Sequence, residues 1–271
     1  MTRISWAVAV VCSVAIAGVG VLWWSNRLPA PAAEPVPSAP APAPAPEVVA
    51  APPAIAYPLE AASGTPPAGF DLGSELAALV SSRAALSMFR LDDFPRRFVA
   101  TVDNLGRPHA TEHLWPVDGA QGHLLVRERD GLTLIDAAND ARYERYVSLM
   151  EQVDPHRVVA LYVRMYPALQ SAYESLGYPH RYFNDRVVAV IDQLLATPDA
   201  REPLAVRAPH VLGAEHPAPP WKSYVFDDAG LEALSAGQKI LLRMGPGNAR
   251  RIKARLAEWR RILSAGAQAQ R

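Results

Sequence analysis

The stretch LGYPHRYFNDRVVAVIDQLLATP, residues 176–198, contains the segment around which the predicted fold is arranged. Residues 186–196 are apolar on nearly all sides, which is typical of a helix buried at the centre of a domain. Asn184 and Asp185 stand just before this run, where a short acceptor side chain caps the free N–H groups of a helix. The sequence therefore predicts a central helix with a polar cap at its start.

Helical patterns flank this segment on both sides. Residues 154–177 predict a long helix that starts at an Asp-Pro pair and ends at Gly177, and Pro167 is expected to kink or split it. Residues 248–263 place apolar side chains on one stripe behind Asn248, which is a second predicted cap. Shorter helices are expected at 71–82, 92–106, 139–153 and 231–245.

A two-residue alternation marks the predicted strands. In HLLVRERDGLTLID, residues 123–136, two alternating runs surround Asp130-Gly131, a pair that favours a tight hairpin turn. EPLAVRAP, residues 202–209, and WKSYVF, residues 221–226, predict two more short strands. The chain is therefore expected to have an α+β fold that is mainly helical, with a small antiparallel sheet.

The N-terminal residues 1–27 predict a membrane anchor. Residues 4–24 carry no charge for 21 positions, and at about 1.5 Å per residue such a helix crosses the roughly 30 Å hydrocarbon core of a bilayer. A cleaved signal peptide is the alternative, but its apolar core is usually shorter, about 7–15 residues. We expect a single-pass protein of the inner membrane whose soluble domain is periplasmic.

Composition divides the rest of the chain into three parts. Residues 28–69 alternate Pro and Ala and predict a disordered tether that buries nothing. Residues 70–264 have the composition of one globular α+β domain, and residues 265–271 are expected to be a disordered tail. The chain has 27 Lys and Arg against 27 Asp and Glu, so its net charge does not indicate a nucleic-acid partner. The only cysteine, Cys12, lies in the predicted span, and no disulfide is expected.

Tyrosine and arginine gather in one region of the sequence. Seven of the nine tyrosines lie between residues 143 and 182, interleaved with arginines. These residue types form contact surfaces, because a flat ring stacks and a planar guanidinium binds carboxylates. The alternative is a buried polar network at helix starts. The residues predicted for a polar-ligand or glycan groove are Arg142, Tyr143, Tyr178, Arg181, Tyr182, Asn184 and Asp185.

A basic stretch covers residues 239–261, which hold eight Lys or Arg and one acidic residue. An exposed helix face of this kind would rest on anionic lipid headgroups, and the alternative is an ordinary solvated face. MGPGN, residues 244–248, opens a helix and is a weak candidate for an anion site. The residues predicted for contact with an anionic surface are Arg250, Arg251, Lys253 and Arg255.

Signals for catalysis and for metal binding are weaker. HATEH, residues 109–113, has the spacing of a zinc-binding H-x-x-E-H helix, but the glycine and prolines around it predict a loop. Asp185 and Asp140 are the candidates for a general acid or base if the chain is a hydrolase. No catalytic residue, metal or cofactor is predicted.

Four blocks of sequence, in order, resemble domain-of-unknown-function family 3014. They are RRFVATVDNL, DAANDARYERYVSLM, LYVRMYPALQSAYESLGYPHRYFNDRVVAVIDQLLATP and LSAGQKILLRMGPGNARRIKARLAEWR. The resemblance covers nearly all of residues 70–260, and it implies a bacterial, membrane-anchored protein of unassigned activity. It supplies no catalytic residue.

These observations together predict a non-enzymatic module of the cell envelope that binds or scaffolds. Its partners would be the inner membrane, through residues 4–24, and peptidoglycan or an envelope protein. A hydrolase of an envelope polymer that uses Asp185 is one alternative. A lipid-apposed assembly protein that uses the basic C-terminal helix is another, and it requires the basic face to be exposed and contiguous.

Overall fold

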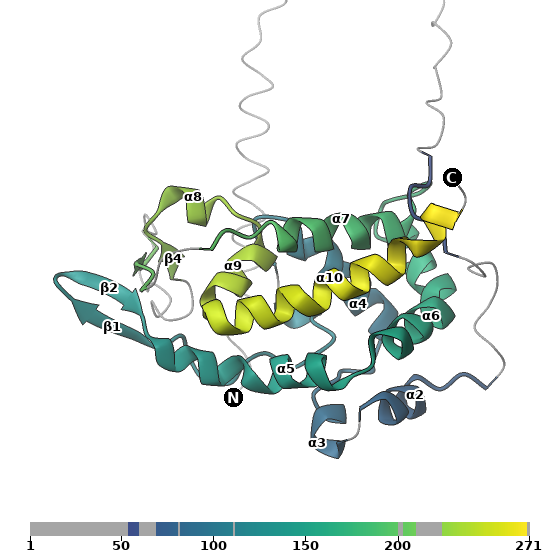
Figure 1. The fold of residues 1–271 in the computed structure, drawn as a ribbon, viewed down its shortest axis with the longest axis horizontal. Coiled ribbons are helices and arrows are strands. Elements are labelled where there is room, and N and C mark those ends of the chain that lie inside the picture. The colour runs from purple at the N-terminus through teal and green to yellow at the C-terminus, as the bar shows by residue number, and fades with distance from the viewer. Residues whose placement is uncertain are drawn as a thin grey trace, which may run out of the picture. The chain divides into compact units, whose positions relative to one another are not determined.

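The computed structural model describes residues 54–59, 69–80, 82–110, 112–199, 203–209 and 224–269. These residues form an α+β fold that is mainly helical (Figure 1). The helices are α2 (Leu72–Leu79), α3 (Arg83–Leu86), α4 (Phe94–Leu105), α5 (Asp140–Gln152), α6 (Pro155–Ser175), α7 (Phe183–Leu195), α8 (Ala229–Glu232), α9 (Ala236–Arg243) and α10 (Pro246–Ala269). The described part also has two 3₁₀ turns, η1 (Glu112–Leu114) and η2 (Ala137–Asn139), and four strands, β1 (Val126–Arg129), β2 (Leu132–Ile135), β3 (Val206–Arg207) and β4 (Val225–Phe226).

Helix α7 is the central helix, as its apolar run predicted. It packs against α4, α6, α9 and α10, and Figure 1 shows α10 running beside it. Phe183 and Val188 are completely buried, and they join apolar side chains from α4, α6 and α10 in one core. The helix begins at Phe183, three residues earlier than predicted. This earlier start changes the roles of Asn184 and Asp185, which are described below.

Helix α6 is a single helix with Pro167 inside it, so Pro167 does not split the helix, and the alternative of a kink stays a prediction. Its start is the predicted one, because the Asp154 side chain accepts a hydrogen bond from the Arg157 N–H at 2.9 Å. It ends at Ser175, and Gly177, two residues later, has a φ of +105° that favours glycine, as predicted for the residue that stops this helix. Buried residues from α6 lie on both sides of Pro167, and we attribute the continuity of the helix to their packing in the core.

Helix α10 is longer than predicted. Residues 265–269, predicted as part of a disordered tail, continue the helix to Ala269. Alanine, the best helix former, occupies three of these five positions, which accounts for the extension. Ile252, Leu256 and Leu263 are buried in the core, as their spacing predicted.

The turn between α9 and α10 contacts the start of α5. Gly245 has a φ of +84°, and α10 begins at Pro246. Asn248 was predicted as the cap, but it lies inside the first turn of α10. Its buried amide donates to the main-chain oxygen of Met244 at 3.0 Å and of Asp140 at 2.9 Å. The side chain therefore fastens α10 to α5 instead of capping its own helix.

Two small antiparallel sheets account for the predicted strands. β1 pairs with β2 through the Asp130-Gly131 turn, where both residues have positive φ, as a type I′ hairpin turn requires. β3 pairs with β4, with Val206 opposite Phe226. A bridge between Leu134 and Ala205 joins the two sheets. The prediction of antiparallel strands is confirmed, although they form two sheets instead of one.

The predicted membrane span at residues 4–24 lies outside the described residues. Within the part of the chain that the structure describes, no helix is both long enough and apolar enough to cross a bilayer.

Candidate functional site

The first turn of α7 is capped by α6 and not by its own side chains. The Phe183 N–H donates to Oε1 of Gln170 at 2.8 Å, and the Asn184 N–H donates to the hydroxyl of Tyr166 at 3.1 Å. Tyr182 occupies the N-cap position without a side-chain hydrogen bond to the helix. The prediction that Asn184 or Asp185 caps this helix is therefore wrong. Because α6 satisfies the free N–H groups, both side chains are available for other contacts.

Asp185 binds a segment that lies far away in the sequence. Its Oδ1 accepts from the Tyr57 N–H at 2.8 Å, and its Oδ2 accepts from the Ala56 N–H at 3.0 Å. Residues 54–59, called the docked segment below, belong to the predicted tether 28–69. The prediction that this tether buries nothing is wrong for the docked segment, whose last three residues are half-buried.

Asn184 and Tyr182 complete the contact with the docked segment. Nδ2 of Asn184 donates to the Tyr57 carbonyl oxygen at 2.8 Å, and its Oδ1 accepts from the Tyr162 hydroxyl at 3.2 Å. The Tyr182 hydroxyl accepts from the Leu59 N–H at 3.0 Å. Asn184 has no exposed surface, so its orientation is fixed. We call Tyr162, Tyr182, Asn184 and Asp185 the α7 polar cluster.

Two side chains of the docked segment pack against the domain, and the N-terminal end of the segment is exposed. Tyr57 and Leu59 pack against the main apolar core, while 53% of Ile55 is exposed. Arg260 of α10 binds Asp192 of α7, with 2.5 Å between Nε and Oδ1. That bond raises the pKa of the Arg260 guanidinium, and the nearby Tyr57 hydroxyl raises it further by a smaller amount, mainly through electrostatic interaction. The docked segment therefore contacts both α7 and α10.

The seven tyrosines of residues 143–182 are buried or half-buried. Tyr166 and Tyr173 are buried, and Tyr166 packs against Tyr162 and Tyr182 with ring centres 5.7 and 5.2 Å apart. Tyr173 stacks on Tyr178 at 4.6 Å. Burial raises the pKa of Tyr162, Tyr166 and Tyr173, so their hydroxyls remain neutral. The tyrosines therefore lie beneath the site, which fits the alternative of a buried polar network at helix starts better than one exposed contact surface.

The predicted binding residues do not all come together. Arg142 donates to the main-chain oxygens of residues 121 and 122 and to Oδ1 of Asn139, and its guanidinium lies over the ring of Tyr143. Arg142 therefore holds a loop against α5, whereas Tyr143 packs against the main apolar core. Arg181 has an exposed side chain and contributes its main-chain oxygen, which accepts from Gln170. The inclusion of these three residues in a groove with Asp185 is a prediction that the structure does not support.

Tyr178 belongs to a second polar network, which joins α4 to α7. Asp103 of α4 is buried and accepts from Nε of Arg186 at 3.0 Å, from Arg107 at 2.6 Å and from the Tyr178 hydroxyl at 3.0 Å. Arg107 also donates to the Tyr178 hydroxyl. Arg107, four residues on, is a local partner of Asp103, but Arg186 and Tyr178 lie 83 and 75 residues away, so the sequence does not reveal the network.

The two aspartates that were candidates for catalysis have different surroundings. Asp185 uses both carboxylate oxygens to hold main-chain N–H groups, which leaves no oxygen free of a bond for acid–base work. Burial raises the pKa of Asp140, a shift that catalytic acids also show. Its carboxylate, however, lies against Gly245, in a close contact between α5 and the α9–α10 turn. Neither aspartate lines the pocket described below, and the hydrolase alternative stays a prediction.

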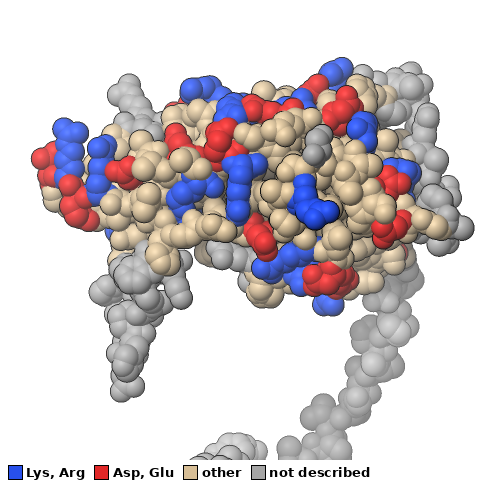
Figure 2. Space-filling view, turned by 90° about the horizontal axis from the view of Figure 1, so that it is seen from below, with Lys and Arg blue, Asp and Glu red and all other residues tan. Residues whose placement is uncertain are grey.

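The basic face of α10 is largely neutralised. Arg251 binds Glu144 at 2.7 Å and Glu151 at 2.5 Å, both from α5. Arg255 donates to the main-chain oxygens of Met150 and Val153 and binds Glu258. Figure 2 shows basic and acidic side chains interleaved over one face of the molecule. These contacts of Arg251 and Arg255 weigh against a contiguous, free basic surface, although Arg250 and Arg261 are exposed, and the lipid-apposed alternative stays a prediction.

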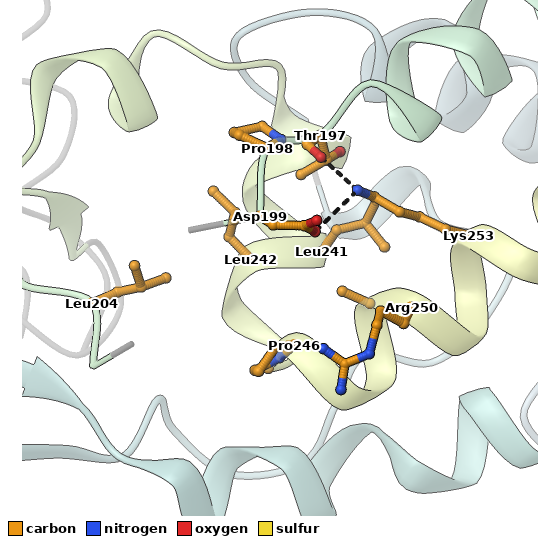
Figure 3. Close-up of a pocket in the computed structure, with 11 residues that line it drawn as sticks. Thr197, Pro198, Asp199, Leu204, Leu241, Leu242, Pro246, Arg250 and Lys253 are labelled. Atoms are coloured by element: carbon orange, nitrogen blue, oxygen red, sulfur yellow. Dashed lines mark hydrogen bonds and ion pairs between the residues drawn. The ribbon is translucent and has the colours of Figure 1, made fainter. Parts of the chain in front are cut away.

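A pocket of about 140 Å³ lies where the end of α7 meets α9 and the start of α10. Its walls include Leu241 and Leu242, and Figure 3 shows Lys253 reaching from α10 towards Thr197 and Asp199. The Lys253 ammonium donates to the Thr197 main-chain oxygen at 2.5 Å and lies 3.7 Å from Asp199. Arg250 is exposed at the pocket. Because Lys253 is already engaged, this pocket is a poorer candidate for an anion site than residues 244–248 suggested.

The family comparison covers most of the site. The sequence model of DUF3014, described as a protein of unknown function, matches residues 94–260, which is more than half of the chain. The chain belongs to the DUF3014 family. The matched region contains the whole α7 polar cluster, whereas the docked segment lies outside it. No curated protein and no solved structure matches the chain.

The DUF3014 domain places the two histidines of HATEH on different local structures. His109 is exposed in a non-helical stretch, and His113 lies in the η1 turn. The helical spacing needed for a zinc site is therefore absent. Among the residues that the structure describes, no three His, Cys, Asp or Glu side chains gather as metal ligands would.

Tyr57 is the residue of this site that the predictions missed. It is the only aromatic residue in 28–69, and with its neighbours it interrupts the Pro and Ala alternation. An isolated aromatic in such a tether is a usable signal for a docking point. Gln170, Tyr162 and Tyr166 carried no comparable signal, because only the packing of α6 on α7 gives them their roles.

The Arg251 ion pairs of the DUF3014 domain give a pH-dependent prediction. The hydrogen bond from Arg251 lowers the pKa of Glu144 from 4.5 to about 2. Because the folded pKa is below the unfolded value, the pair stabilises the fold above about pH 4.5, and this contribution is lost as the pH falls towards about 2. We expect Arg251→Met to lower the urea midpoint at neutral pH, with a difference from wild type that shrinks in acid.

The matched control for this prediction is Arg261→Met, because Arg261 is an exposed arginine of the same helix. It should change the midpoint little at any pH. A difference between Arg251→Met and wild type that stays constant from about pH 7 to about pH 2.5 would contradict the assigned role of Glu144.

Proposed function

We propose that this DUF3014 protein is an anchored, extracytoplasmic binding and scaffolding module of the bacterial cell envelope, and that its α7 polar cluster binds polypeptide main chain. The supporting observation is the contact with the docked segment. Side chains of Asp185, Asn184 and Tyr182 make four hydrogen bonds to it, all of them to main-chain N–H or C=O groups. The site is therefore matched to the polar groups that every peptide carries.

The pattern of donors and acceptors favours a peptide over a glycan. Asp185 accepts from two successive N–H groups, and Asn184 donates to the carbonyl oxygen that follows them. Consecutive N–H donors followed by a C=O acceptor are a property of polypeptide main chain. An envelope protein fits this arrangement better than the glycan strands of peptidoglycan.

The tether gives this binding module a reach from the membrane. Residues 28–53 lie between the proposed anchor, residues 4–24, and the docked segment. At about 3.1 Å per residue in a polyproline conformation, these 26 residues extend to roughly 80 Å. In this proposal the inner membrane is bound through residues 4–24, and the domain works in the periplasm at a distance set by the tether.

The binding proposal is tested with the full chain in detergent micelles. Residues 54–59 are replaced by Gly and Ser at constant length, which empties the α7 polar cluster, and a fluorescent peptide with the sequence of residues 52–61 is titrated by anisotropy. We expect saturable binding. Adding Asp185→Ala should weaken it by at least about tenfold, because two hydrogen bonds to a charged group are lost, each contributing about 1.5–3 kcal/mol.

The control for that experiment is Asp199→Ala, which removes an aspartate whose side chain is 94% exposed. This variant should bind the peptide as well as the parent chain does. If Asp185→Ala and Asp199→Ala bind it equally well, the α7 polar cluster is not the peptide site. If the emptied chain does not bind the peptide, the proposed function is wrong.

A further inference from the structure

Resting on this proposed function, we infer that the docked segment is a built-in competitor. It occupies the α7 polar cluster of its own chain, and a segment of another envelope protein with an aromatic–Pro–aliphatic sequence displaces it. Displacement both fills the site with the partner and frees the end of the tether. The α7 polar cluster is thus a gated peptide site, because the docked segment controls access to it. Binding of a partner also increases the distance that the domain can move from the membrane.

The ligand class follows from which atoms of the docked segment are recognised. The N–H groups of Ala56, Tyr57 and Leu59 each have an acceptor in the cluster. Pro58 stands at the one position between them that has no N–H to satisfy. The Tyr57 and Leu59 side chains pack against the core, which favours an aromatic and an aliphatic residue on either side of the proline.

The site does not recognise the side chains at the N-terminal end of the docked segment. Ala54, Ile55 and Ala56 are exposed. A foreign segment therefore needs to match the docked segment over only three side chains, those at the positions of Tyr57, Pro58 and Leu59. Such a short requirement is readily met by another protein, and it also limits the affinity of the segment for its own cluster.

The domain does not depend on the docked segment for the start of α7. The N–H groups of Phe183 and Asn184 are satisfied by Gln170 and Tyr166 of α6, with or without the segment. Oδ1 of Asn184 is held by Tyr162 in the same way. Release of the segment exposes the Asp185 carboxylate and Nδ2 of Asn184, and the bond from Tyr162 still orients the Asn184 side chain. Together with the independently capped start of α7, this bond keeps Asn184 in place for an incoming peptide.

Release also changes the length of the tether. With the segment docked, residues 28–53 separate the anchor from the domain; with it released, residues 28–69 do so. The additional 16 residues add up to roughly 50 Å at about 3.1 Å per residue. A partner that carries the matching segment would thus allow the domain to move farther from the membrane.

The docked segment competes from a high effective concentration. Nine residues, 60–68, join it to Gly69 just before α2, and a short linker of this kind gives an effective concentration in the millimolar range. A peptide that binds the emptied cluster with a dissociation constant of about 10 µM should therefore bind the intact chain roughly 100-fold more weakly. The ratio of the dissociation constants of the intact and the emptied chain therefore distinguishes a gated site from an open one.

The experiment compares the intact full chain with the chain in which residues 54–59 are Gly and Ser, both in detergent micelles. Each is titrated with the labelled peptide of residues 52–61 and with a version in which its tyrosine is alanine. Hydrogen exchange of the docked segment is followed by mass spectrometry in the same samples. We expect a 10- to 100-fold weaker affinity for the intact chain. Saturating peptide should deprotect the amides of Ala56, Tyr57 and Leu59 while the first turn of α7 stays protected.

Each other outcome has a definite meaning. Equal affinity in the two chains shows that the segment does not occupy the cluster in solution, which overturns the gate and leaves the peptide-binding function standing. Weaker binding to the intact chain without deprotection of the docked segment places the peptide elsewhere and also overturns the gate. Equal binding of the alanine peptide removes the assigned ligand class. No binding to either chain removes the proposed function itself.

Discussion

Replacing Asp103 by alanine is expected to lower the free energy of unfolding by about 3–5 kcal/mol, the usual cost of breaking a buried ion pair by removing one partner. The Asp103 side chain is only 5% exposed and is bound by Arg186, whose side chain is 27% exposed. Without the carboxylate, the Arg186 charge stays between α4 and α7 with one bond left, from its Nη2 to the main-chain oxygen of residue 103 at 2.8 Å. Tyr178 loses an acceptor at the same time.

Urea unfolding of the full chain in detergent, followed by tryptophan fluorescence, measures this loss. The matched control is Asp92→Ala. Asp92 also binds an arginine, Arg97, but the Asp92 side chain is 71% exposed. A pair with such an exposed carboxylate is expected to contribute about 1 kcal/mol or less, and without it Arg97 keeps its bonds to the main-chain oxygens of residues 92 and 113. If the two substitutions destabilise the chain equally, then the buried position of Asp103 has no special importance for the contact between α4 and α7.

Local signals in the sequence were sufficient for most helices and for the hairpin. Asp71 and Asp154 cap α2 and α6 through hydrogen bonds to residues three positions later, and the Asp130-Gly131 turn depends only on its own two φ angles. Such features are determined within a few residues, so their patterns are reliable. The start of α7 was misplaced because its cap comes from Gln170 and Tyr166, which belong to another helix.

The polar residues of the candidate site were predicted, but the segment that they bind was not. Tyr182, Asn184 and Asp185 were singled out as a polar group, and the structure brings them together around the docked segment. What they bind lies 123 to 129 residues away in sequence, inside a stretch whose Pro and Ala content predicted a plain tether. Composition averages over many residues, so one aromatic at Tyr57 did not change the prediction.

The basic helix illustrates the opposite error. Counting charges along α10 predicted a free cationic face, because only one acidic residue lies in the same stretch. The compensating carboxylates come from other helices: Glu144 and Glu151 of α5 bind Arg251, and Asp192 of α7 binds Arg260. Whether a run of cations is a binding surface or part of the packing depends on tertiary neighbours, which a single helix cannot reveal.

Gly245→Ala is expected to destabilise the fold by about 2–4 kcal/mol, from two separable causes. The first is conformational, because a φ of +84° is unfavourable for alanine by about 1–2 kcal/mol. The second is steric: a Cβ at this position would lie 2.5 Å from Cγ and 2.6 Å from Oδ2 of Asp140, well inside van der Waals contact. The overlapping atoms belong to the carboxylate of Asp140, so relief of the overlap requires this side chain to rotate away from the α9–α10 turn.

Two variants separate these causes in urea unfolding experiments. Gly122→Ala has the conformational penalty alone, because φ is +75° there and no heavy atom lies within 4 Å of the added Cβ; it should cost about 1–2 kcal/mol. The double variant Gly245→Ala/Asp140→Ala removes the overlap but keeps the φ penalty, so it should be more stable than Gly245→Ala alone. Since Asp140 and Gly245 are in contact, their effects should not add. Strict additivity would show that the two positions do not touch, and that the α9–α10 turn is not packed on the start of α5.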